Sequence, residues 1–125
     1  MTPPGAAGPG SAHGTRVYVP ASLAALRGYA AAGSVPAAAD RVVAPDTDEE
    51  SEYAALMTAA DLSAEAQGAG AQRVVLVAEV DEPDGDIPWR TVVAVHADPG
   101  PRRPGADPDD DLGWYATQEV GDLLS

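Results

Sequence analysis

The spacing of apolar residues changes several times along the chain, and each spacing predicts a kind of element. Two segments carry apolar residues three and four positions apart and predict helices, over residues 22–33 and 47–68. Short runs rich in β-branched and aromatic residues predict strands at 16–19, 41–44, 74–80, 91–96 and 114–120. The expected order of elements is therefore β-α-β-α-β-β-β.

Both predicted helices carry signals at their ends. Ser22 is placed to cap the first helix, and Gly33 is placed to end it. At the start of the second helix, Thr47 and Glu50 have the spacing of a capping box. The second helix is predicted to bury one apolar stripe, made of Tyr53, Leu56, Met57, Ala60 and Ala64.

These elements predict an α+β fold. The run at 74–80 is apolar without alternation, which is typical of a strand that is covered on both faces or central in its sheet. The most economical packing for this order of elements is a mixed β-sheet with two helices packed on one face.

A length of 125 residues fits a single domain. Residues 1–14 are mostly Pro, Gly and other small residues, and we expect a disordered tail there. Residues 15–125 are expected to form the domain, with a mobile acidic, Pro-rich loop at 98–111. Neither a secretory leader nor a run of apolar residues long enough to span a membrane is recognisable, so we expect a cytoplasmic location.

Acidic residues outnumber basic ones by 20 to 7, which gives a net charge of −13. This charge argues against a function in binding nucleic acid or an anionic membrane. Cysteine is absent, so we expect neither a disulfide nor a thiolate metal site, and the sequence predicts no cofactor. Phenylalanine is absent too, so the core is expected to be thin and of modest stability unless a partner contributes to it.

His96 and Asp98 at the end of a predicted strand are the candidate catalytic pair. Residues two apart share one face of a strand, so His96 could act as a general base that Asp98 orients. No motif for a nucleophile accompanies the pair. A strand-end histidine that is hydrogen-bonded to a carboxylate or to backbone explains the same residues without catalysis.

Two acidic clusters are explained without a ligand. Residues 107–111 resemble the start of a calcium-binding loop, but Leu112 and Gln118 stand where such a loop needs Gly and Glu. A solvated acidic loop is the better interpretation, and a divalent-cation sensor remains a third alternative. The other cluster is explained by the helix dipole and comprises Glu49, Glu50 and Glu52.

The last predicted strand supplies a candidate partner-binding surface. If Trp114 and Ala116 face the core, then Tyr115, Thr117 and Glu119 share the exposed face. If this strand also lies at the edge of the sheet, its backbone can pair with another chain. Strand propensity alone explains Tyr115 and Thr117 equally well.

Three segments of the chain stand out together, namely R-V-Y-V-P-A-S-L at 16–23, E-E-S-E-Y-A-A-L at 49–56 and W-Y-A-T-Q-E at 114–119. With them the chain resembles an actinobacterial family of small acidic proteins of unknown function. The resemblance covers most of residues 16–124, and residues 114–119 are its most specific part. The chain departs from the family at 99–104, where prolines replace a helix-forming segment. Since that family has no assigned activity, the resemblance implies a fold and no catalytic residues.

The sequence favours a non-catalytic cytoplasmic domain that acts through contact with an unidentified protein. Its acidic surface favours basic partners through electrostatic steering. The alternative is a small hydrolase-like or ligand-binding enzyme that uses His96 with Asp98, which requires both side chains in one concave pocket. Homo-oligomerisation and the order of the strands are left open.

Overall fold

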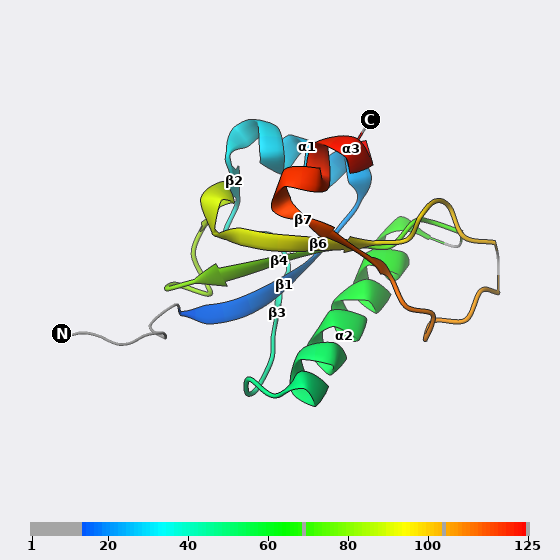
Figure 1. Ribbon diagram of the computed structural model, residues 1–125, viewed down its shortest axis with the longest axis horizontal. Coiled ribbons are helices and arrows are strands. Elements are labelled where there is room, and N and C mark those ends of the chain that lie inside the picture. Colours follow the sequence, from blue (N-terminus) through cyan, green and yellow to red (C-terminus); the bar gives the residue numbers. More distant parts are fainter. Residues whose placement is uncertain (1–13, 69, 104, 125) are drawn as a thin grey trace.

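A five-stranded sheet forms the centre of the molecule (Figure 1). The computed structural model describes residues 14–68, 70–103 and 105–124. The strands run across the sheet in the order β3-β1-β4-β6-β7, and each neighbouring pair is antiparallel. Their bounds are β1 Thr15–Ala21, β3 Val42–Val43, β4 Val74–Val80, β6 Val92–Ala97 and β7 Gly113–Ala116.

The long pairing of β1 with β4 determines which side chains face which side of the sheet. Val17 lies opposite Ala78, and both belong to one buried cluster. The next pair along, Tyr18 and Val77, belongs to a second buried cluster on the other face. Because both faces are covered, β4 is apolar along nearly its whole length, as its sequence predicts.

The first face carries the larger cluster. Leu26 is fully buried there, and so are Val35 and Ile87, while Val120 is nearly so. These residues come from two helices and a small two-stranded sheet, namely α1 Leu23–Ala32, α3 Val120–Leu124, β2 Ser34–Val35 and β5 Ile87–Pro88. Figure 1 shows α1 and α3 together on this side.

The opposite face is covered by α2 (Glu49–Gln67), which packs on β1, β3 and β4. The side chains that α2 buries are small, so its backbone can lie close to the sheet. They are Ala55, Ala59, Ala60 and Ser63. The predicted apolar stripe included Tyr53 as its largest side chain, and this part of the prediction is wrong, because Tyr53 is 50% exposed.

Ser63 joins α2 by hydrogen bonds to the end of β1 and the start of β4. Its hydroxyl donates to the Ala21 carbonyl at 2.6 Å and accepts from the Val74 N–H at 3.1 Å. Gln67, one turn later, donates to the same hydroxyl at 3.0 Å. This buried polar side chain therefore has the partners that its burial requires.

The α+β class is confirmed, but two details differ from the expected arrangement. The helices α1 and α2 lie on opposite faces of the sheet and not on one face. The described strand pairs are all antiparallel, so the sheet is not mixed. The physical reason for the first difference is that β4 is apolar on both sides, so helices on one face would leave Val75 and Val77 exposed.

The helix ends agree closely with the expected ones. Ser22 caps α1 by accepting from the Ala25 N–H at 3.0 Å, and Gly33 ends it with φ of 77°. The cap of α2 is Asp48 and not Thr47, because the Asp48 carboxylate accepts from the Ser51 N–H at 2.7 Å.

The end of the chain differs most from the prediction. The expected strand over 114–120 stops at Ala116 and is followed by the 3-10 helix η3 (Thr117–Glu119) and by α3. At the point where the strand ends, the Glu119 carboxylate accepts a hydrogen bond from the Ala116 N–H at 2.8 Å. The connector between β4 and β6 also contains more structure than expected, because β5 and a 3-10 helix, η2 (Trp89–Thr91), lie within it.

The predicted tail lies outside the described residues, apart from Gly14. Within the described ranges, no helix combines the length and the apolar character needed to cross a bilayer. The mobility expected of the loop at 98–111 stays a prediction.

Candidate functional site

A groove of about 320 Å³ runs between α2 and the strands β6 and β7. It exists because α2 packs on β1, β3 and β4 and leaves the neighbouring part of that face open. Val77 and Tyr18 line the groove from the centre of the sheet. The other lining residues are Arg16, Glu52, Tyr53, Leu56, Val93, Ala94, His96 and Trp114.

The groove collects most of the large apolar side chains that are exposed in the described part of the chain. These are Val43, Tyr53, Val93 and Trp114, with exposures of 45%, 50%, 38% and 61%. All but Val43 line the groove. Apolar side chains gathered on one concave surface are typical of a binding site.

A β-bulge explains why Val93 is among them. Ala94 pairs with Val77, while Val92 pairs with Ala78, so Val93 is an extra residue in β6. The bulge turns Val93 toward the same side as Ala94, and both line the groove. Bulges are frequent beside functional sites, where they redirect a side chain in this way.

Arg16 forms the polar end of the groove. Its Nη2 and Nε donate to the Glu79 carboxylate at 2.6 and 3.2 Å, and its Nη1 lies 3.6 Å from Glu52. The hydrogen bond with Glu79, working against the cost of burial, raises the pKa of Arg16. Arg16 therefore stays charged and brings carboxylates from β4 and α2 together.

His96 lies on the floor of the groove and is partly buried. Burial lowers its pKa below the ordinary value, and the positive charge of Arg16 lowers it further. The imidazole is therefore neutral at neutral pH.

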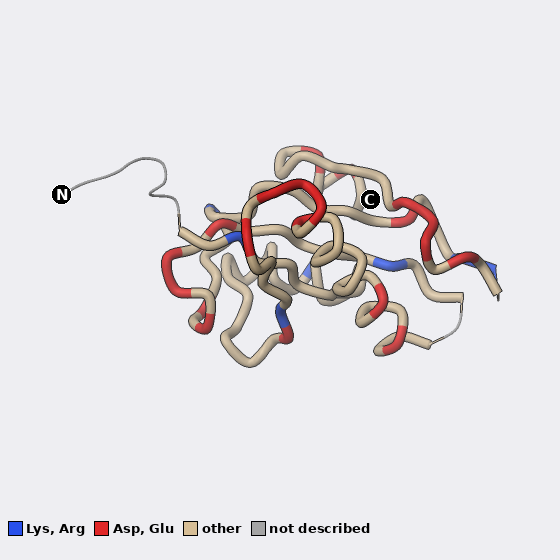
Figure 2. The backbone as a smooth tube through the Cα atoms, turned by 90° about the horizontal axis from the view of Figure 1, so that it is seen from below, with Lys and Arg blue, Asp and Glu red and all other residues tan. Residues whose placement is uncertain are grey.

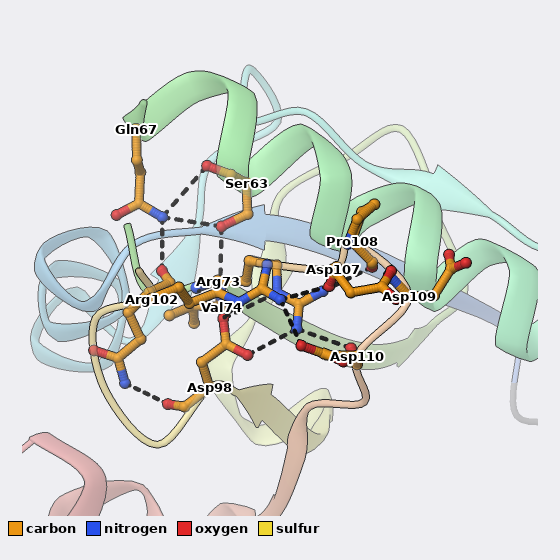
Figure 3. A network of polar contacts seen from close by, with 11 residues as sticks. Ser63, Gln67, Arg73, Val74, Asp98, Arg102, Asp107, Pro108, Asp109 and Asp110 are labelled. Atoms are coloured by element: carbon orange, nitrogen blue, oxygen red, sulfur yellow. Dashed lines mark hydrogen bonds and ion pairs between the residues drawn. The ribbon is translucent and has the colours of Figure 1, made fainter. Parts of the chain in front are cut away.

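Asp98, the predicted companion of His96, is engaged elsewhere (Figure 3). Arg73 Nε donates to Asp98 Oδ2 at 2.9 Å, Nη2 donates to Oδ1 at 2.8 Å, and the Arg73 N–H donates to Oδ2 at 2.8 Å. Burial raises the pKa of the Asp98 carboxyl, but these hydrogen bonds and the charge of Arg73 outweigh it and hold the pKa below its usual value. Neither a hydrogen bond nor an ion pair joins Asp98 to His96 within the described residues, so the structure does not assemble the pair.

The same guanidinium organises the acidic loop. Arg73 donates to the carbonyls of Pro108 and Asp110 at 3.0 and 2.8 Å. Arg102 adds an ion pair to Asp98 at 3.6 Å and one to Asp110 at 3.2 Å. Figure 3 shows these groups converging from the residue before β4, the residue after β6 and the loop. The arrangement has a structural function, because it gives a buried charge its partners.

The part of the chain that carries these sites can be compared with known proteins. Residues 15–107 match the model of a family of unknown function, DUF6912. The chain belongs to this family. Neither curated proteins nor solved structures give a match. The match confirms the expectation of a family without an assigned activity, while an actinobacterial source stays a prediction.

The DUF6912 match includes the groove residues of β1, α2, β4 and β6, but Trp114 lies beyond it. The segment at 114–119, the most specific part of the resemblance, also lies beyond the matched residues. Both Arg73 and Asp98 lie within them. The match therefore covers the floor and one wall of the groove.

In this DUF6912 protein, Tyr115, Thr117 and Glu119 do not share one exposed face. Tyr115 packs against the first core cluster, and the Thr117 hydroxyl donates to the Val92 carbonyl at 2.8 Å. Glu119 caps the Ala116 N–H. The alternation is the reverse of the predicted one, so Trp114 is exposed while Tyr115 is partly buried. The strand does lie at the edge of the sheet, as the strand-pairing hypothesis requires.

The acidic loop touches the groove at one point. The Tyr53 hydroxyl donates to Asp111 Oδ1 at 3.0 Å, and this hydrogen bond raises the pKa of Tyr53. Among the described residues, no group of three His, Cys, Asp or Glu side chains is arranged to hold a metal ion.

A second hollow, of about 680 Å³, lies beside β4, β5 and η2. Its volume is larger than that of the groove, but four of its nine lining residues are acidic and none is aromatic. Its lining residues are Glu79, Val80, Asp81, Glu82, Asp86, Pro88, Arg90, Thr91 and Val93. We therefore treat the aromatic groove as the candidate site.

Proposed function

We propose that this protein is a non-catalytic protein-interaction domain and that the groove between α2 and β7 receives a segment of its partner. The observation that carries the proposal is the gathering of Tyr53, Val93 and Trp114 around one groove. Aromatic side chains are enriched at protein interfaces, where they supply large contact areas with a polar end.

The alternative of a hydrolase-like enzyme receives less support. It needs Asp98 to orient His96, but both carboxylate oxygens of Asp98 accept hydrogen bonds from Arg73. The neutral imidazole that remains on the groove floor is suited to van der Waals contact and to hydrogen bonding with a bound segment through its donor and its acceptor nitrogen.

The surface charge restricts the partner. With a net charge of −13, nucleic acid and anionic membranes are poor partners, whereas a basic protein is attracted (Figure 2). A cytoplasmic location remains part of this proposal, and subcellular fractionation tests it. Light scattering on the purified chain tests whether it also self-associates.

The proposal is tested by partner capture with three variants of the full chain. Trp114→Ala and Tyr53→Ala each remove one wall of the groove, while Val43→Ala removes an exposed apolar side chain outside it. A protein captured by the wild type should be retained by Val43→Ala. It should bind Trp114→Ala at least about tenfold more weakly, since an interface aromatic is worth roughly 2 kcal/mol. Capture that is unchanged in both groove variants would exclude the groove as the interface.

A further inference from the structure

The exposed walls of the groove are aromatic. Tyr53 stands on α2 and Trp114 on β7, and both are at least half exposed. The face of an aromatic ring carries negative potential, which is strongest for tryptophan, and attracts a cation placed over it. These walls therefore suit a guanidinium or ammonium group better than an anion.

Carboxylates around the groove add to this preference. Glu52 and Glu79 lie beside Arg16, and Asp111 accepts a hydrogen bond from the Tyr53 hydroxyl. In these contacts, three negative charges are set against the single positive charge of Arg16. Acidic residues are also spread over the rest of the molecule, as the red segments in Figure 2 show, in keeping with the net charge of −13.

Glu52 has capacity to accept further hydrogen bonds. Its 3.6 Å distance to Arg16 is too long for a hydrogen bond, and its carboxylate accepts none from the described residues. The side chain is 28% exposed and lines the groove. Glu79 differs, because its Oε2 already accepts two hydrogen bonds from Arg16 and its side chain does not line the groove. Glu52 is therefore the carboxylate that an incoming donor would meet.

We infer that the groove binds an arginine side chain from a basic segment of a partner protein, stacked on Trp114 and Tyr53 and hydrogen-bonded to Glu52. This inference rests on the proposed function. Arginine fits better than lysine because a planar guanidinium stacks on a ring and can donate two parallel hydrogen bonds to one carboxylate. The net charge of the chain favours a basic segment over a second copy of this acidic protein.

The experiment selects binders from a library of displayed random peptides on the immobilised full chain and measures their affinity by calorimetry. The best peptides should contain arginine. Replacing that arginine by citrulline, a neutral side chain of the same shape, should weaken binding about tenfold or more. Higher salt should reduce the affinity of the arginine peptide more than that of the citrulline peptide.

The protein variants separate the roles of charge and shape. Glu52→Gln should lower the affinity for the arginine peptide and leave the affinity for the citrulline peptide nearly unchanged. Glu65→Gln makes the same charge change at an exposed site of α2 outside the groove, and should leave both affinities unchanged.

The outcomes distinguish the two levels of the hypothesis. If selected peptides lose affinity in Trp114→Ala but tolerate citrulline, the groove is the interface and the arginine inference is wrong. If selected peptides bind Trp114→Ala and Tyr53→Ala as tightly as the wild type, or if no peptide is selected, both the inference and the proposed function are contradicted.

Discussion

Arg73 and Asp98 form the most deeply buried charged pair among the described residues, with exposed side-chain fractions of 1% and 5%. A buried ion pair contributes little net stability when intact, because desolvation offsets the attraction between the charges. Removing one of the two charges lowers the stability strongly, since the remaining charge stays buried without its partner. The pair therefore makes the fold sensitive to either residue.

Asp98→Asn is expected to lower the free energy of unfolding by about 3 kcal/mol, because it leaves the Arg73 guanidinium buried beside a neutral group. Denaturant unfolding followed by circular dichroism measures the change. Asp109→Asn is the matched control, since Asp109 is an exposed residue of the same loop and should change stability by less than about 0.5 kcal/mol. If the two substitutions lowered the free energy of unfolding equally, the fold would not depend on the buried ion pair.

His96 predicts a dependence of stability on pH. Burial and the charge of Arg16 lower its pKa in the folded protein, so the unfolded chain takes up a proton at a higher pH than the folded one. The stability contributed by the neutral imidazole is present above about pH 6.5, the ordinary value, and is lost as the pH falls below it. Melting temperatures of the wild type should therefore fall between pH 7.5 and 5, and those of His96→Gln should fall less. Parallel curves would contradict this.

At the scale of elements, α2 shows how a helix can pack through small side chains. Ala59 is fully buried between the helix and the sheet. Ala59→Leu should destabilise the protein by about 1–3 kcal/mol, because the close approach of α2 leaves no room for a larger side chain. Ala66→Leu adds the same atoms on the exposed side of α2 and serves as the control. Thermal unfolding of both variants measures the difference, and an equally stable Ala59→Leu protein would mean that the helix can move away from the sheet.

Glu119 blocks part of the free edge of the strand β7. Its carboxylate accepts the Ala116 N–H, which points away from β6 and would otherwise be open to another strand. Glu119→Ala should lower the free energy of unfolding by about 1 kcal/mol, as the loss of a helix cap does. It should also increase self-association, because the edge of β7 is then open. Asp122→Ala removes an equal charge from α3 without touching the edge. Light scattering at increasing protein concentration distinguishes the two variants, which should behave differently if the cap protects the edge.

At the scale of the whole molecule, the net charge of −13 sets a cost of self-repulsion. Salt screens this repulsion, and at about 0.15 M the screening length is about 8 Å. The melting temperature should therefore rise between low salt and 0.5 M sodium chloride, since the exposed ion pairs of Arg16 and Arg102 contribute little that salt can remove. A melting temperature that falls with salt would show that these surface pairs outweigh the repulsion.

Some of the fold could be predicted because a local signal was sufficient. Ser22 and Gly33 end α1 through contacts within a few residues, and the apolar run of β4 predicts its covered position in the sheet. The placement of α2 could not be predicted in the same way. Its buried face is made of alanines and Ser63, which a pattern of large apolar residues does not reveal.

The groove itself was not predicted, and His96 is the one lining residue that the sequence singled out as a candidate for chemistry. His96 was identified because histidine is chemically conspicuous, but its assumed partner Asp98 depends on Arg73, which lies 25 positions earlier in the chain. Val93 lines the groove because of a bulge in β6. Trp114 lines it because the side chains of β7 alternate between the two faces of the sheet in the opposite sense to the predicted one. Each of these depends on pairing between strands, and a single sequence contains no direct signal for such pairing.

The central pairing of β1 with β4 also affects how the chain folds. Thr15 lies opposite Val80, so the two middle strands can meet only after a loop containing α1, β3 and α2 has closed. Closing so long a loop costs entropy before any contact repays it, which makes folding slow compared with that of a protein built from local hairpins. During synthesis, the first strand must wait for residues 74–80 to leave the ribosome, and until then its apolar side chains lie open to other chains.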